Sequence, residues 1–194
     1  MKPMKELIFA TNNKHKLMEV RPLLEGKVLI HSLSEIGLEG DIPETADTLE
    51  GNALQKAMWV YQRTGRDCFA DDTGLEVDAL GGAPGVYSAR YAGEDCSFDD
   101  NMNKLLAALH GVENRQARFR TVVCLLQNGQ PHYFEGRVEG HILTEKHGTE
   151  GFGYDPIFQP NESNVPFAQM DMQAKNKISH RGRAMAKLIE YLKQ

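Results

Sequence analysis

Short apolar segments alternate with helical patterns along the first half of this sequence. Glu6 to Ala10, Lys27 to Leu33 and Cys68 to Asp71 read as strands, and apolar residues recur at helical spacing after each of the first two. A run of strands and a closing helix follow in the second half. A chain that alternates in this way must fold around a sheet with helices packed against it.

The second half of the chain contains a hairpin signal. Between Ala117 and Leu143, β-branched and aromatic residues flank Asn128-Gly129, a dipeptide typical of a tight turn between two strands. Ser97 and Asp100 form a capping-box pattern, which predicts the start of a helix ahead of this hairpin. The closing helix is predicted from about Ser179 to Leu192.

A long helix is predicted between the second and third strands. Asp47 and Glu50 form a capping-box pattern that predicts its start. Its buried face is predicted to comprise Leu54, Ala57, Met58 and Tyr61. After the third strand, Leu75, Val77 and Ala79 alternate in a segment that we expect to be extended.

Composition excludes several classes of protein. Of 194 residues, 41% are hydrophobic and 25% are charged, which excludes fibrous, disordered and membrane-spanning chains. The net charge of −5 argues against a broad basic surface for duplex nucleic acid. Cys68, Cys96 and Cys124 include no Cys-x-x-Cys pair, so neither a disulfide framework nor a zinc site is indicated. Leu7 to Ala10 is too short for a signal-peptide core, and we expect a cytoplasmic protein.

Charge is unevenly distributed along the chain. Residues 35 to 50 contain six acidic side chains and no Lys or Arg, whereas residues 175 to 193 contain six basic side chains and one glutamate. The helices predicted to start near Lys14 and His180 both begin with basic residues, although a helix N-terminus favours anions. We infer a polyanionic ligand; the alternative is that these are ordinary solvated side chains.

The segment Thr11 to Lys16 joins the first strand to the first helix, as a phosphate-binding loop does, but without glycines. It does not match the Gly-x-x-x-x-Gly-Lys-Ser/Thr pattern, so a Walker-type ATPase is not indicated. Thr11 and Asn13 can cap the helix or hydrogen-bond phosphate oxygens, and Lys16 can reach a β- or γ-phosphate. Capping alone is the alternative, and it does not explain Lys16.

Asp71 and Asp72 come directly after the third predicted strand, where ligands often bind at a sheet edge. One carboxylate can face an ion there while its neighbour takes part in the structure. Mg²⁺ is held in proteins by one or two carboxylates together with phosphate oxygens and water. Glu44, or another acid of residues 35 to 50, is the natural second ligand. Plain turn chemistry from Asp71 to Gly74 is the alternative.

Gly151 to Pro156 combines flexible backbone, two aromatic side chains and a carboxylate in six residues. Aromatic faces stack on bases, and Asp155 can accept hydrogen bonds from the N–H groups of a purine. Core aromatics beside a turn are the competing interpretation.

Six segments, in order along nearly the whole chain, resemble the motifs of one family. They are Thr11 to Lys16, Glu44-Thr45 with Gly51 to Ala57, Ala70 to Leu75, Gly81 to Tyr91, Gly151 to Pro156, and Lys175 with Ser179 to Gly182. On these segments the chain is similar to the inosine triphosphate pyrophosphatases, hydrolases of non-standard purine nucleoside triphosphates.

The resemblance implies an α/β fold in a single domain over residues 1–194, with a mixed central sheet, helices on both sides and two lobes around a substrate cleft. It also implies Mg²⁺-dependent hydrolysis of dITP, ITP and XTP to the nucleoside monophosphate and pyrophosphate. The family usually forms homodimers. No nucleic acid or membrane partner is expected.

Carried over residue by residue, the resemblance implies three groups of site residues. Thr11, Asn12, Asn13, Lys14, His15, Lys16 and Lys56 would contact the triphosphate. Glu44 and Asp72 would hold Mg²⁺, and Asp72 would act as the general base. Thr73 would lie beside the sugar and phosphates, Phe152, Gly153, Tyr154 and Asp155 would take the base, and Lys175, His180 and Arg181 would complete the purine pocket.

Two positions depart from the family's frequent residues, which bears on fine specificity. Asn12 stands where glycine is frequent, and Thr73 where serine is frequent. Arg181 and backbone donors are expected to favour a 6-oxo purine over adenine, whose 6-amino group would leave them unpaired. Alternative functions are a pyrophosphatase of modified pyrimidine nucleotides, a nucleotide sensor without turnover, and a metal-stabilised structural protein.

Overall fold

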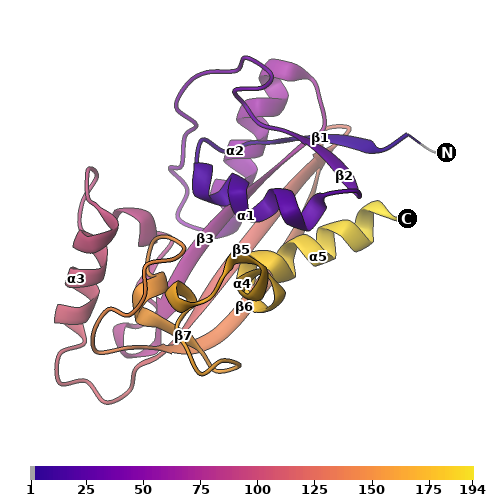
Figure 1. The fold of residues 1–194 in the computed structure, drawn as a ribbon. Helices are drawn as coiled ribbons and strands as arrows, with labels where there is room; N and C mark the ends of the chain where they lie inside the picture. The colour runs from indigo at the N-terminus through magenta and orange to yellow at the C-terminus, as the bar shows by residue number, and fades with distance from the viewer. Residues whose placement is uncertain (1–2) are drawn as a thin grey trace. The chain divides into compact units, whose positions relative to one another are not determined.

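One mixed sheet forms the framework of the computed structural model, which describes residues 3–194. The strands are β1 (Lys5–Phe9), β2 (Val28–His31), β3 (Cys68–Val77), β4 (Pro84–Gly85), β5 (Gln116–Gln127), β6 (Gln130–Ile142) and β7 (Phe158–Pro160). They lie in the order β2-β1-β3-β5-β6-β7, with β4 paired to β3 (Figure 1). β1 is parallel to β2 and β3, whereas β7 is antiparallel to β6. The predicted α/β class with a mixed sheet is confirmed.

Five α-helices and four short 3-10 helices complete the described residues. The α-helices are α1 (Lys14–Leu24), α2 (Leu49–Thr64), α3 (Phe98–Ala108), α4 (Met172–Ile178) and α5 (His180–Leu192). The 3-10 helices are η1 (Asp78–Leu80), η2 (Ser88–Arg90), η3 (Asp155–Ile157) and η4 (Phe167–Gln169). No helix within residues 3–194 has the length and apolar character needed to cross a membrane.

The chain divides into two compact units. The first unit comprises the residues up to Asp72, Thr121–Gly136 and Arg181–Gln194; the second comprises Thr73–Arg120 and Arg137–His180. β3, β5 and β6 each contribute residues to both units.

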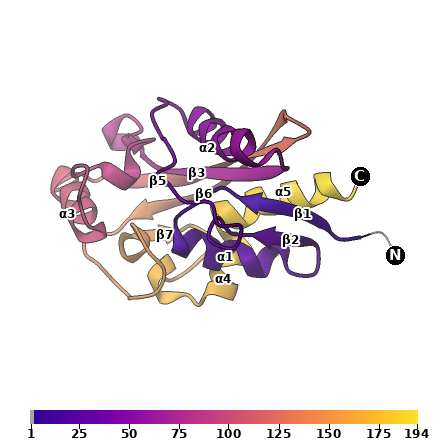
Figure 2. The same ribbon diagram turned by 90° about the horizontal axis from the view of Figure 1, so that it is seen from above.

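The core of the first unit lies on its parallel strands. Leu7 to Ala10 and Cys68 to Ala70 are at most 1% exposed, and the rings of Phe9 and Phe69 stack with centroids 4.6 Å apart. In Figure 2, α2 covers one face of this part of the sheet, and α1 and α5 cover the other. Parallel strands buried on both faces require continuous apolar runs, which explains the short apolar segments in the sequence.

The hairpin and one helix start agree with the sequence-based predictions. Asn128 and Gly129 both have positive φ, 51° and 77°, as a two-residue turn between β5 and β6 requires. Ser97 caps α3 through a capping box with Asp100. In the second unit, Leu105 of α3 packs in the same buried cluster as the β5 residue Phe119.

The start and the buried face of α2 were predicted wrongly. Thr48 is the N-cap residue, because its hydroxyl accepts the backbone N–H of Gly51 at 3.0 Å. The buried residues of α2 are Leu49, Asn52, Ala53, Lys56, Ala57 and Val60, so only Ala57 of the predicted face is fully buried. Two polar side chains occupy this face, and an apolar pattern could not reveal them.

Asp71 and Asp72 lie in the middle of a ten-residue strand rather than after a short one. The predicted strand end and the alternative turn are both wrong, because β3 continues to Val77. The parallel neighbour β1 ends at Phe9, opposite Phe69, so the two aspartates lie just beyond its carboxyl end. Ala79, predicted to be extended, lies in η1 and is exposed.

A short helix before the closing one was not predicted. Asp171 caps α4 by accepting the N–H of Ala174 at 2.7 Å, and Ser179 ends it. Lys175 and Asn176 are the buried residues of α4, so the helix lacks an apolar stripe in its sequence. α5 therefore begins at His180, one residue after the predicted start.

A buried ion network joins α1, β3 and α5 in the first unit. The Arg181 guanidinium donates from Nε to Asp71 Oδ2 at 2.9 Å and from Nη1 to Glu19 Oε2 at 2.6 Å. Lys16 Nζ lies 3.1 Å from the other oxygen of Asp71. Arg181, Asp71 and Glu19 are each at most 3% exposed. Charges this deeply buried are tolerated only as hydrogen-bonded partners.

The network sets the protonation of its members. Burial alone would raise the pKa of Asp71, but Lys16 and Arg181 outweigh it and hold this pKa well below its usual range. Burial would likewise lower the pKa of Arg181, which Asp71 and Glu19 instead raise. The ion pairs therefore persist as charged pairs at neutral pH.

Replacing Glu19 by Ala should destabilise the protein by about 3–5 kcal/mol, because it leaves a buried guanidinium short of one carboxylate. Urea unfolding at pH 7 measures this loss. The matched control is Glu25→Ala, an exposed residue at the end of the same helix, which should change stability by less than about 0.5 kcal/mol. Equal losses of stability from the two substitutions would contradict the role of Glu19 as a stabilising partner of Arg181.

The protein should also lose stability in acid through Asp71. A carboxyl group whose pKa is depressed by folding contributes stability above its unfolded value, near 3.8, and loses it as the pH falls below that value. The loss approaches about 1.4 kcal/mol per pH unit for one proton. Urea unfolding between pH 5 and pH 2.5 should show a shallower pH dependence for Asp71→Asn than for the unaltered protein. If stability falls equally steeply with pH in both proteins, Asp71 does not contribute to the loss of stability in acid.

Candidate functional site

Two carboxylates of the first unit share one lysine. Lys56 Nζ lies 2.5 Å from Glu44 Oε1 and 3.9 Å from Asp72 Oδ1. Lys56 comes from the buried face of α2, Asp72 from the middle of β3, and Glu44 from the loop before α2. The structure therefore brings the two predicted metal ligands to the same ammonium group.

The two carboxylates have different protonation properties. Burial raises the pKa of Asp72, and the attraction of Lys56 and Lys16 offsets this only in part. Glu44 is also partly buried, but its ion pair with Lys56 outweighs burial and lowers its pKa. A carboxylate with a raised pKa is the better proton acceptor of the two, as a general base must be.

The donor set of Glu44 and Asp72 fits Mg²⁺. Both offer hard carboxylate oxygens, and two such ligands suffice for an ion that keeps water and phosphate oxygens in its remaining positions. Within residues 3–194, no group of three or more His, Cys, Asp or Glu side chains could enclose a metal. The pair suits an ion that is shared with a phosphate ligand.

The predicted phosphate segment is ordered by its own hydrogen bonds. Asn13 caps α1, because its Oδ1 accepts the N–H groups of His15 at 3.0 Å and of Lys16 at 3.2 Å. Thr11 Oγ1 accepts the N–H of Asn13 at 3.0 Å. Capping thus accounts for Asn13, as the alternative interpretation had it, and Thr11 orders the capping residue.

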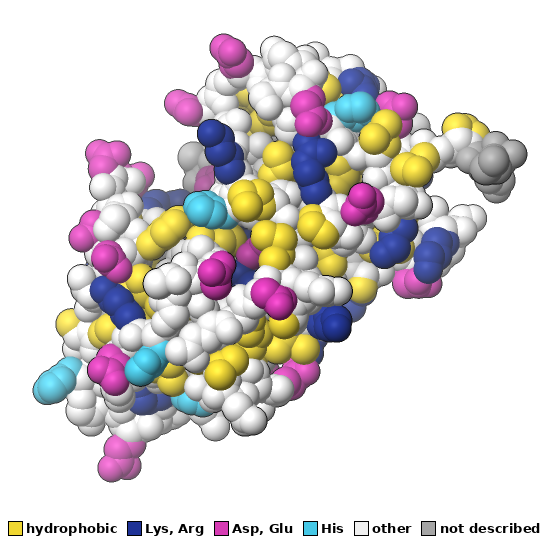
Figure 3. Space-filling model, in the orientation of Figure 1, with side chains coloured by type: hydrophobic (Ala, Val, Ile, Leu, Met, Phe, Trp, Pro, Cys, Tyr) yellow, Lys and Arg dark blue, Asp and Glu magenta, His cyan; other side chains and the backbone are white. Residues whose placement is uncertain are grey.

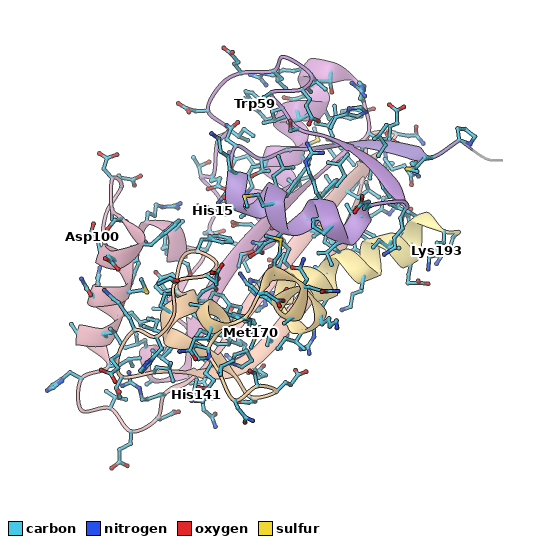
Figure 4. All side chains as sticks on the ribbon, in the orientation of Figure 1. His15, Trp59, Asp100, His141, Met170 and Lys193 are labelled. Atoms are coloured by element: carbon cyan, nitrogen blue, oxygen red, sulfur yellow. The ribbon has the colours of Figure 1, made fainter. Side chains whose placement is uncertain are left out.

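The cations at the start of α1 differ in exposure. Lys14 and His15 are exposed, and Figure 4 shows His15 at the start of the helix. Lys16 points inward to Asp71, and burial, with the nearby cations Lys56 and Arg181, lowers its pKa although Asp71 opposes the shift. Lys16 is thus held beside Asp71 and close enough to Asp72 to feel its charge.

The basic start of α5 has an internal explanation. Arg181 is 1% exposed and is paired with Asp71 and Glu19, so its charge needs no external anion. The basic start of this helix therefore does not by itself indicate a polyanion. The contact of Arg181 with a purine stays a prediction.

In the second unit, Asp155 connects two other predicted base-site residues. Its Oδ2 accepts Lys175 Nζ at 2.7 Å and the backbone N–H of Phe152 at 3.0 Å. Lys175 Nζ lies 5.0 Å from the centre of the Phe152 ring, within cation–π range. Gly151 has φ of 74°, and a Cβ there would overlap Asp155 Oδ2, so only glycine lets this carboxylate approach the loop backbone.

Tyr154 and His180, the other predicted ring-bearing residues of this unit, pack in its core. Tyr154 is 5% exposed, donates its hydroxyl to Ser88 O at 2.6 Å, and has its pKa raised by burial. His180 stacks on Phe119 with centroids 4.6 Å apart. The core-aromatic interpretation therefore holds for Tyr154, whereas Phe152 is only half-buried.

Each unit gathers a chemically distinct set of the predicted residues. The first unit holds Thr11, Asn12, Asn13, Lys14, His15, Lys16, Glu44, Lys56, Asp72 and Arg181. The second holds Thr73, Phe152, Gly153, Tyr154, Asp155, Lys175 and His180. Charged groups suited to phosphates and metal thus belong to one unit, and aromatic groups suited to a base to the other.

Sequence reasoning missed three polar residues beside the carboxylates of the first unit. Glu19 pairs with Arg181, Asn52 donates to Asp72 Oδ2 at 3.0 Å, and Gln55 hydrogen-bonds the loop that carries Glu44. Asn52 and Lys56 are four residues apart on one helix and so lie on the same face, which was the signal available in the sequence.

Comparison with known proteins identifies close relatives over the whole chain. The sequence profile of the Ham1 family matches residues 7–191. A dITP/XTP pyrophosphatase of Porphyromonas gingivalis is 57% identical over 97% of this chain and 98% of its own length, and one of Flavobacterium psychrophilum is 53% identical over 97% and 99%. The solved structure of a HAM1 protein from Coxiella burnetii matches with a TM-score of 0.88 and 38% identity, over 98% of this chain and 99% of that one. The chain belongs to the Ham1 family.

Proposed function

We propose that the protein hydrolyses non-standard purine nucleoside triphosphates, namely dITP, ITP and XTP, to the nucleoside monophosphate and pyrophosphate. The relatives described above are dITP/XTP pyrophosphatases, which supports this proposal. The observation that carries it is the arrangement of Glu44 and Asp72 around Lys56, with Lys16 held close to β3. Such a set offers metal ligands, a base and phosphate-binding cations together.

Water would attack the α-phosphorus, and the bond from this atom to the bridging oxygen of the β-phosphate would break. Asp72, a carboxylate with a raised pKa, would accept the proton of the attacking water. Lys16 and Lys56 would stabilise the charge that develops on the departing pyrophosphate. Glu44 and Asp72 would hold Mg²⁺, which supplies charge neutralisation and Lewis acidity when bound.

Recognition of the base would fall to the second unit. The half-buried ring of Phe152 offers an aromatic face, and Asp155 fixes it by holding its backbone N–H. Because Asp155 Oδ2 already binds Lys175 and Phe152, we assign Asp155 the role of ordering these residues. The Lys175 ammonium is a donor that suits an oxo group better than an amino group.

A cytoplasmic homodimer remains our expectation from the family resemblance. A pyrophosphatase of modified pyrimidine nucleotides would use the same residues for phosphate and metal. In such an enzyme, the Phe152 segment would bind a pyrimidine base instead of a purine base. A sensor without turnover would not need the raised pKa of Asp72. These alternatives are separated by the two measurements that follow.

Asp72→Asn should lower kcat for dITP by about 10²–10⁴-fold, because an amide cannot accept the proton of water. The matched control is Asp47→Asn, an exposed residue of the loop before α2, which should keep near-normal turnover. Pyrophosphate release is measured in the presence of Mg²⁺, with urea unfolding as a check that both variants fold. Unchanged turnover in Asp72→Asn would remove its proposed role.

A panel of nucleotides tests the substrate class. We expect dITP, ITP and XTP to be cleaved with kcat/KM at least about 10²-fold above dATP, whose 6-amino group leaves the donors of the pocket unpaired. Phosphate should be detected only after inorganic pyrophosphatase is added, because the first product is pyrophosphate. Equal rates on all four nucleotides would refute the specificity, and faster cleavage of a modified pyrimidine nucleotide would favour the alternative.

A further inference from the structure

One face of α2 fastens the loop that carries Glu44. Asn52, Gln55 and Trp59 are three, four or seven residues apart and therefore lie on the same side of the helix. Each of them contacts the residues of the preceding loop. The loop is thus attached to α2 at several points, on both sides of Glu44 in the sequence.

Gln55 makes the most specific of these attachments. Its Oε1 accepts the backbone N–H of Thr45 at 2.8 Å, and its Nε2 donates to Thr45 Oγ1 at 2.8 Å. One primary amide thus fixes both the main chain and the side chain of the residue that directly follows Glu44. Such a two-point bond defines orientation as well as position.

Asn52 and Trp59 hold the loop on either side of this point. Asn52 Oδ1 accepts the N–H of Ala46 at 2.9 Å, while its Nδ2 donates to Asp72 Oδ2 at 3.0 Å. Before Glu44, Gly40 lies so close to the indole that a Cβ there would be 3.2 Å from Trp59 Cζ2. Figure 4 shows Trp59 by the loop that precedes α2.

The Glu44 side chain is 36% exposed, so its carboxylate is located by its ion pair with Lys56 and by the position in which the loop holds its backbone. We propose that Gln55 is a positioning residue for Glu44: its two-point bond with Thr45 sets the carboxylate where it shares a metal ion with Asp72. The inference rests on the proposed function, since the metal ion is the one used in hydrolysis. Asn52 complements it by linking the same loop to Asp72.

The test compares Gln55→Leu with Gln62→Leu, an exposed glutamine of the same helix. Residues that orient metal ligands typically change metal affinity by about 10–100-fold when removed. Gln55→Leu should therefore raise the Mg²⁺ concentration for half-maximal turnover of dITP about 10-fold, with kcat at saturating Mg²⁺ within about two-fold of normal. Gln62→Leu should change neither value. Thr45→Val, which removes only the acceptor of Gln55 Nε2, should give a smaller shift in the same direction.

A second readout needs no turnover. Trp59 is the only tryptophan of the chain and contacts the loop, so bound Mn²⁺ should quench its fluorescence. The midpoint of an Mn²⁺ titration without nucleotide should shift in Gln55→Leu by about the same factor as the Mg²⁺ requirement. If no nucleotide is hydrolysed, the proposed function fails, while this titration still decides the positioning role.

A double substitution separates positioning from general stability. If Gln55 acts through Glu44, Gln55→Leu should have no further effect on metal midpoints in a Glu44→Gln background. The proposal is overturned if Gln55→Leu lowers kcat without moving either midpoint, or if its effect is equally large in the Glu44→Gln background. Either result would leave Gln55 with a structural role only.

Discussion

The buried carboxylate of Asp71 is the interaction on which the first unit depends. It binds Lys16 of α1 through one oxygen and Arg181 of α5 through the other, and these partners lie 55 and 110 residues away in the sequence. An unpaired charge at this depth would cost several kcal/mol. Because both partners are required, the ends of two helices are fixed against the middle of β3. The acidic and basic residues of this unit are therefore arranged by folding itself, ahead of any ligand.

The local pairing also explains how a chain of net charge −5 can present cations to phosphates. Figure 3 shows acidic and basic side chains interspersed on the displayed face, without a broad basic patch. Lys56 is paired with Glu44 and Asp72, which compensate its charge. In the proposed reaction, a metal ion would compete with Lys56 for these carboxylates. Metal binding would then release this lysine toward phosphate. Binding of the metal ion and binding of the phosphates would thus be linked in the proposed reaction.

Sequence patterns predicted the features that depend on interactions between neighbouring residues. The Asn128-Gly129 turn and the capping box of Ser97 depend on residues within a few positions, and both are confirmed. The interior of β3 was missed because two adjacent aspartates can occupy a buried strand only with partners that no local pattern shows. The polar face of α2 was missed for the same reason: Asn52 and Lys56 are buried by their bonds to distant carboxylates. The roles of the site residues came from family resemblance and stay predictions.

The strand geometry of β3 imposes a constraint on chain length. Side chains alternate between the two faces of a strand, so Asp71 and Asp72 point to opposite sides. Deleting one residue between Cys68 and Asp71 would place Asp72 at the position that faces Arg181 and Thr73 at the position that faces Lys56. Inserting one residue would place Asp71 at the position that faces Lys56 and leave Arg181 without its carboxylate on this strand. The spacing of this segment should therefore tolerate substitutions but no gaps.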